Sequence, residues 1–90
     1  MANHKSALKE HRQSLARRDR NRNHRSRLRT ALKEFRRHLT DGKLDEAKAL
    51  LPATLSLTDR TARLGAIAKT TASRTKSRLA RALNRAQASA

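Results

Sequence analysis

The chain has 90 residues, of which 36% are hydrophobic and only Phe35 is aromatic, and it has no cysteine. We expect one small domain over residues 1–90 with a thin core, and the missing cysteines exclude disulfides and metal–thiolate sites. The net charge of +16 predicts a polyanionic partner, because self-repulsion of this size destabilises a compact protein on its own.

The positive charge is concentrated at the two ends of the chain. Residues 1–40 carry a net charge of +10, residues 41–64 carry 0 and residues 65–90 carry +6. No apolar run is long enough to span a membrane, and the N-terminus lacks the apolar core of a signal peptide. We therefore expect a soluble, intracellular protein in which two basic segments flank a neutral one.

The first predicted element is a helix over about residues 5–40, because Lys5 to Leu39 contains neither Gly nor Pro. Residues 17–27 contain no apolar side chain and include six arginines, so this half of the helix has no face for packing. We expect it to protrude, and to fray up to about Arg25 when no polyanion is bound. The other half has an apolar stripe at helical spacing, which consists of Leu28, Ala31, Leu32, Phe35 and Leu39.

Two leucines in the first half of this helix do not share that stripe. At about 100° per residue, Leu8 and Leu15 lie well over 100° away from it. They are either tolerated surface residues or contacts for a separate partner.

A second helix is predicted over about residues 44–64, after a turn in which Gly42 suits the left-handed C′ position. Asp45 and Glu46 then lie in its first turn, where carboxylates favour the helix dipole. Pro52 either kinks this helix or splits it, and we favour a kink because two apolar stripes keep their phase across it. The stripes are Leu44, Ala47, Leu51, Leu55, Thr58 and Ala62, and, separately, Leu50, Leu57 and Leu64. Two stripes predict two neighbouring helices.

A third helix is predicted over about residues 70–85, after Gly65 and with Thr70 or Thr71 as its N-cap. Its apolar face consists of Ala72, Leu79, Leu83 and Ala86, and an arginine stripe lies on the opposite face. We expect the tail over residues 86–90 to fray. The predicted fold class is therefore all-α, a three-helix bundle with a long protruding N-terminal helix.

The sequence contains no recognisable catalytic or metal site. His4, His11, His24 and His38 are too widely spread for a helix-face metal pair, and we interpret them as surface histidines. The serines have no acid–base neighbours at catalytic spacing, and two glycines do not make a phosphate-binding loop. We predict no enzyme activity, no cofactor and no small-molecule substrate.

The basic segments predict binding to nucleic acid through phosphates and riboses, because the arginine fork matches phosphate oxygens. Without aromatic interleaving, base stacking of the single-strand-binding type is not expected. A nucleoid-type DNA-binding protein shares the same charge argument and is the main alternative. A membrane-active or calmodulin-target-like helix needs a broad apolar face, which residues 17–27 lack.

Several motifs together resemble the bacterial small-subunit ribosomal protein S20 family across essentially the whole chain. They are Met1 to Ala7, Gln13-Ser14, Arg20 to Arg22, Arg25-Ser26, Arg29 to Ala31, Asp41-Gly42 and Gly65 to Asn84. The chain departs from the family at Ala68, Lys69 and Thr70, where His-Lys-Asn is common, and in the position of Pro52. The resemblance implies a three-helix bundle that binds 16S ribosomal RNA directly, low in the body of the small subunit.

From this we expect a structural ribosomal protein in the cytoplasm that is not a homo-oligomer and meets other small-subunit components mainly through RNA. Its predicted RNA contacts are the basic and polar side chains of the two end helices. They are Asn3, Lys5, Lys9, Arg12, Gln13, Arg17, Arg18, Arg20, Asn21, Arg22, Arg25, Ser26, Arg29, Lys33, Lys69, Arg74, Lys76, Ser77, Arg78, Arg81 and Arg85.

Overall fold

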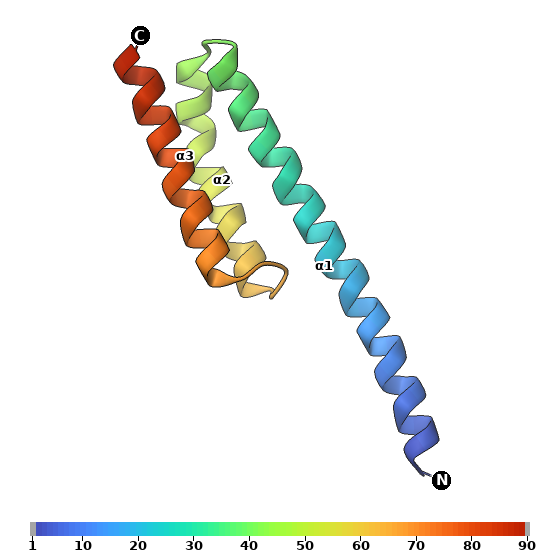
Figure 1. Cartoon of the computed structure of the whole chain (residues 1–90). Helices are drawn as coiled ribbons and strands as arrows, with labels where there is room; N and C mark the ends of the chain where they lie inside the picture. Colours follow the sequence, from blue (N-terminus) through green and yellow to red (C-terminus); the bar gives the residue numbers. More distant parts are fainter. Residues whose placement is uncertain (1, 90) are drawn as a thin grey trace.

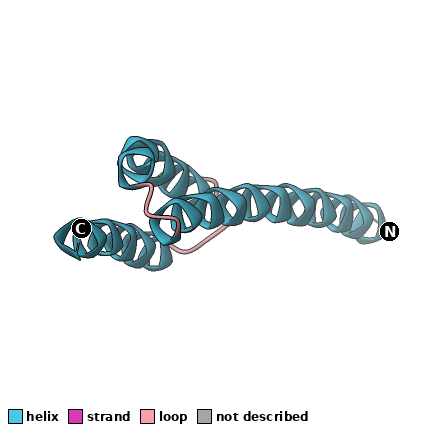
Figure 2. Ribbon diagram, turned by 90° about the horizontal axis from the view of Figure 1, so that it is seen from above, coloured by secondary structure: helices cyan, strands magenta, loops and turns pink. Residues whose placement is uncertain are grey.

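The computed structural model describes the backbone of residues 2–89 and the side chains of residues 5–89. It contains three helices, α1 (Ala2–Thr40), α2 (Leu44–Arg63) and α3 (Lys69–Ser89), as Figure 1 shows. No strand occurs among the described residues, and Figure 2 shows α1 extending well beyond the other two helices. The predicted all-α, three-helix fold is confirmed. Within the described residues, no helix is both long and apolar enough to cross a bilayer.

Helix α1 is much longer than the bundle that it joins. Its 39 residues span about 58 Å, whereas the 20 residues of α2 span about 30 Å. Leu28 and Phe35 are buried in the half that lies beside α2. From Lys5 to Arg20 every side chain is exposed, so the first half of α1 is a free-standing rod. Its fraying in the absence of RNA stays a prediction.

Two glycines end α1 and α2 in the same way. After α1, the Lys43 N–H donates to the His38 carbonyl (2.8 Å) and the Gly42 N–H donates to the Leu39 carbonyl (3.3 Å). This is the Schellman pattern, and Gly42 has the left-handed φ of +74° that the pattern requires. Gly65 repeats it after α2 with a φ of +78°. The predicted C′ role of Gly42 is confirmed.

Helix α2 continues without interruption through Pro52, so the chain has one helix here and not two. It packs along both neighbours, whereas α1 and α3 meet at few positions. The predicted arrangement, in which the neutral helix lies between the two basic ones, is confirmed. The kink that we predict at Pro52 stays a prediction.

The centre of the α2 core is a row of small residues, of which Ala47 and Thr58 belong to the first predicted stripe and Thr54 and Thr61 to neither stripe. Ala47, Thr54, Thr58 and Thr61 are its buried residues, and most of its leucines are only half-buried. Each of the three threonines donates its hydroxyl hydrogen bond to the carbonyl four residues earlier, at 2.7–2.9 Å. Small side chains in this row let α1 and α3 approach α2 closely, while the leucines fill the space on either side.

The second predicted stripe of α2 is wrong at its last member. Leu64 is 50% exposed and lies beyond the end of the helix. The leucine stripe keeps its phase only within the helix, and the turn at Gly65 leads the chain away before Leu64 can pack.

Helix α3 is longer than predicted at both ends. It begins at Lys69, so Thr70 and Thr71 lie inside the helix and neither is its N-cap. It continues past Arg85 to Ser89, because the alanines of the tail are strong helix formers and no Gly or Pro stops them. Its buried residues are Ala72, Leu79 and Leu83.

The three helices meet in one core cluster. Phe35, which is 0% exposed, belongs to this cluster with Ala47, Leu79 and Leu83. Two polar contacts join the same elements at the surface: His38 Nδ1 lies 3.1 Å from Glu46 Oε2, and Lys76 Nζ lies 2.8 Å from Asp59 Oδ1. The core fixes α3 and the last third of α1 against α2, and thereby sets where their basic faces point.

Candidate nucleic-acid interface

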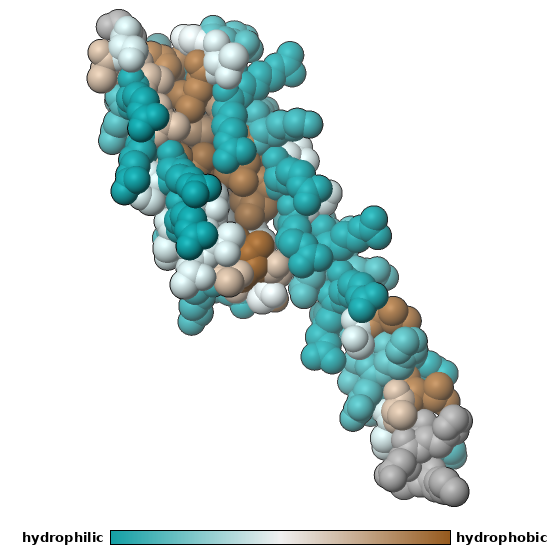
Figure 3. Space-filling model, in the orientation of Figure 1, coloured by the Kyte–Doolittle hydropathy of each residue, from teal (hydrophilic) through white to brown (hydrophobic). Residues whose placement is uncertain are grey.

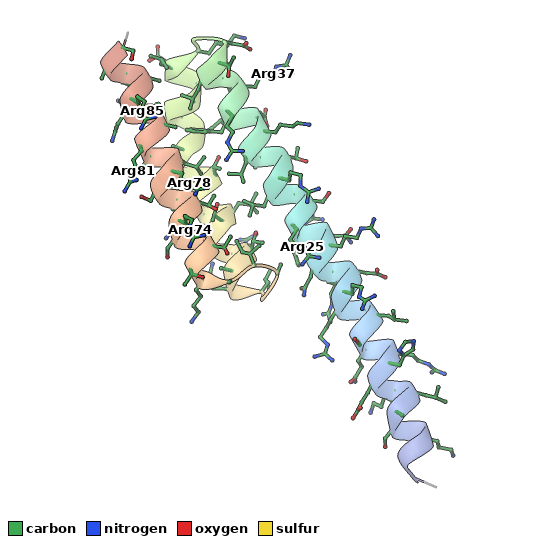
Figure 4. All side chains as sticks on the ribbon, viewed as in Figure 1. Arg25, Arg37, Arg74, Arg78, Arg81 and Arg85 are labelled. Atoms are coloured by element: carbon green, nitrogen blue, oxygen red, sulfur yellow. The ribbon has the colours of Figure 1, made fainter. Side chains whose placement is uncertain are left out.

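The arginines of α3 form a one-sided stripe. With about 100° of rotation per residue, each of these arginines points at least about 100° away from the buried Leu79 around the helix axis. All are exposed, and Figure 4 shows them following one another along α3. The four are Arg74, Arg78, Arg81 and Arg85.

The arginines of the rod are arranged differently, because they surround it. At about 100° per residue, Arg12, Arg17 and Arg18 point in three widely separated directions around the helix. All three are exposed. Figure 3 shows hydrophilic surface on both edges of the rod, whereas the hydrophobic surface gathers mainly between the helices.

Few of these cations are neutralised inside the protein. Among the side chains of residues 5–89, carboxylates pair only with Arg37, His38 and Lys76. The Arg37–Asp41 pair is long, at 3.9 Å, and solvent-exposed. The arginines predicted to bind RNA therefore keep their donors free of carboxylates, and they are available for an external anion.

The structure places almost all of the predicted contact residues at the surface. Asn21 and Lys76 are half-buried, Asn3 lies outside the described side chains, and the others are exposed. The fold groups them into two sets, one on α1 and one on α3, with the neutral α2 between them. Lys76 stands apart, because its ammonium already meets Asp59.

Arg25 is a predicted contact residue with an additional structural role. Its Nη1 donates to the Ala66 carbonyl at 3.4 Å, across the gap between α1 and the turn that joins α2 to α3. Figure 4 shows Arg25 at the point where α1 leaves the bundle. This contact links the base of the rod to the rest of the molecule.

Sequence reasoning missed several residues of this surface. Arg27 and Arg36 are exposed arginines of α1 that the prediction omitted, although their residue type alone was a sufficient signal. His24 was interpreted as a surface histidine but is half-buried. Its signal was helical phase, because His24 lies four residues before the buried Leu28.

Comparison with known proteins identifies the family. The family model for ribosomal protein S20 matches residues 2–84. The chain belongs to the ribosomal protein S20 family. The small ribosomal subunit protein bS20 of Desulfatibacillum aliphaticivorans is 46% identical over 81 residues, which cover 90% of this chain and 92% of the relative.

Other bacteria have relatives of similar identity. The small ribosomal subunit protein bS20 of Desulfosudis oleivorans is 44% identical over 96% of this chain and 98% of its own length. That of Aquifex aeolicus is 42% identical over 96% of this chain and 92% of its own length. Membership of the S20 family confirms the resemblance inferred from the motifs. Members of this family are structural proteins and not enzymes, which also confirms the prediction that the chain is no enzyme.

Proposed function

We propose that this chain is a structural protein of the small ribosomal subunit, located in the cytoplasm, that binds 16S ribosomal RNA directly. The observation that carries the proposal is the pair of cationic surfaces on α1 and α3. The arginines predicted to bind RNA there meet no carboxylate among the described side chains. The names of the S20 relatives support the ribosomal part of the proposal.

On α3, the proposed contact is a row of phosphates along one strand of an RNA helix. Arg74 and Arg85 are eleven residues apart, so the stripe extends over about 16 Å of helix axis. The opposite face is buried on α2, so RNA approaches α3 from one side only. The guanidinium fork holds a phosphate through two parallel hydrogen bonds, which fixes the position of the backbone without reading its sequence.

On α1, the proposed contact involves several RNA segments. Because the arginines of the rod point in all directions, one flat surface would leave half of them in solvent. The rod therefore inserts between RNA helices and neutralises phosphates on more than one side. When RNA folds, phosphates of different helices come close together and repel one another. The positive charges of the rod reduce this electrostatic repulsion. In this way the protein stabilises a particular RNA fold.

Binding to purified 16S ribosomal RNA over a range of salt concentrations tests the proposal. Because bound cations release counterions from the phosphates, we expect the logarithm of affinity to fall steeply and linearly with the logarithm of salt. At matched salt, we expect tighter binding to 16S ribosomal RNA than to duplex DNA of similar length.

Three outcomes would contradict the proposal. A flat salt dependence would show that charge does not drive binding. Equal or tighter binding to duplex DNA would favour a nucleoid-type DNA-binding protein instead. Failure of the protein to travel with intact small ribosomal subunits in a density gradient, run without ribonuclease, would remove the ribosomal assignment.

A further inference from the structure

The place where the rod leaves the bundle is hollowed. A cavity of about 360 Å³ lies between α1 and the turn that follows α2. We call it the corner pocket, and it is lined by Arg17, Arg20, Asn21, His24, Leu64 and Gly65. Its volume lies near the lower end of the range for small-molecule sites, which is too small for a nucleic-acid duplex.

The α1 side of the corner pocket continues the face of the helix that packs in the core. At about 100° per residue, Arg17, Asn21 and His24 point within about 40° of Phe35. A helix that packs on protein along this line needs apolar side chains there, as at Leu28. On the N-terminal side of Leu28, the residues on this face of α1 are polar or cationic. The part of the face that lines the corner pocket therefore suits an anionic ligand and not a protein core.

The opposite wall supplies the apolar surface. Leu64 is 50% exposed, although Ala66, two residues later, is buried. Gly65, with its φ of +78°, makes the sharp turn that leaves Leu64 on the cavity wall. The Arg25 to Ala66 hydrogen bond of 3.4 Å ties this turn to α1, so the two walls are held facing each other.

We propose that the corner pocket takes one unpaired nucleotide of the bound RNA. The Arg17 and Arg20 guanidiniums hold its phosphate, and its base lies against Leu64 and the His24 ring. Unstacked bases in RNA loops and bulges commonly stack on histidine or lie on apolar surface, and Asn21 offers an amide to the base edge. This inference rests on the proposed function, and it adds a base contact to a surface that otherwise meets only phosphate and ribose.

Substitution of Leu64 tests the inference, because Leu64 carries no charge and its half-exposed side chain is not needed for the core. We expect Leu64→Ala to weaken binding to 16S ribosomal RNA about tenfold, which is the size of one base contact, and to leave the salt dependence unchanged. The matched control is Leu8→Ala, a leucine of similar exposure (47%) on the rod, for which we expect less than a twofold change.

A second pair of variants separates stacking from structure. His24→Phe keeps an aromatic ring in the corner pocket, so we expect near-normal affinity, whereas His24→Ala should lose affinity as Leu64→Ala does. Chemical probing of the RNA supplies an independent measurement. One unpaired base that the wild-type protein protects should become reactive with Leu64→Ala, while the rest of the protected region stays the same.

The possible failures are distinguishable. If the wild-type chain shows no preference for 16S ribosomal RNA, the proposed function fails. If the wild-type chain binds as proposed but Leu64→Ala binds equally well, or loses no more than Leu8→Ala, only the corner pocket proposal is overturned. A photoreactive residue at position 64 that crosslinks to base-paired RNA would also overturn it.

Discussion

The two halves of α1 are one continuous helix, yet different forces hold them. Residues 28–40 lie against α2, and Phe35 in that half is completely buried. Every side chain of residues 5–20 is exposed, and Leu8 and Leu15 remain 47% and 44% exposed. Figure 3 shows small hydrophobic patches on the flank of the rod that turns away from the bundle. The comparison indicates that burial stabilises one half, whereas the other half depends on the continuity of the helix.

The largest expected effect comes from the buried half. Phe35→Ala removes the only aromatic ring from the centre of the core, and we expect a loss of about 3–5 kcal/mol in the free energy of unfolding, which is most or all of the stability of so small a core. Thermal denaturation followed by circular dichroism measures the loss. Leu15→Ala is the control in the exposed half, with an expected change within about 0.5 kcal/mol. Equal effects of the two variants would contradict the comparison.

Amide hydrogen exchange of the free protein measures the same contrast without substitution. In the half beside α2, we expect the most slowly exchanging amides to exchange only when the whole protein unfolds. Their opening free energy should therefore equal the free energy of unfolding, about 3–5 kcal/mol for so small a core. In the rod we expect opening free energies that fall toward zero at the N-terminus, because no tertiary contact opposes fraying. Uniform protection from Lys5 to Leu39 would mean that helix propensity alone stabilises the rod.

Removing positive charge from the rod tests the exposed half of α1 through its binding to RNA. With Arg17, Arg18, Arg20 and Arg22 all changed to Gln, we expect the slope of log affinity against log salt to fall by about 3. We expect binding to 16S ribosomal RNA to weaken at least about a hundredfold, or about 2.7 kcal/mol. The free energy of unfolding should not decrease, since these side chains make no core contact. A matched set of changes at Arg74, Arg78, Arg81 and Arg85 tests whether α3 contributes a similar slope.

The smallest expected effect is at the turn that ends the buried half. Gly42→Ala places a side chain at a φ of +74°, and the open space around the residue rules out a clash. We therefore expect only the backbone cost of the left-handed conformation, about 1–2 kcal/mol, in thermal denaturation. RNA affinity measured below the melting temperature should be unchanged, because Gly42 lies far from the rod.

Much of the fold was predictable from local patterns. The absence of Gly and Pro in the first segment, the two helix-ending glycines and the leucine spacing predict three helices and their order. The charge distribution predicts which helices are cationic and which helix is neutral. These features were accessible because helix formation, capping and face polarity depend on residues within a few turns of one another.

Other features depend on how the helices meet. Thr54 and Thr61 are buried because α1 and α3 converge on the row that they form with Thr58, and neither belongs to a stripe predicted from the sequence of α2 alone. The exposure of Leu64, the Arg25 to Ala66 contact and the half-burial of His24 follow in the same way from where the turn after α2 lies against α1.

The sequence by itself determined three helices, their polarity and a surplus of cations at both ends, since each of these is a property of short segments. Tertiary structure alone decided which side chains line the corner pocket. The pocket brings together residues 17–24 and 64–65, which become neighbours only when the three helices pack. Their separation of about forty residues in the sequence therefore does not indicate that they are close in space.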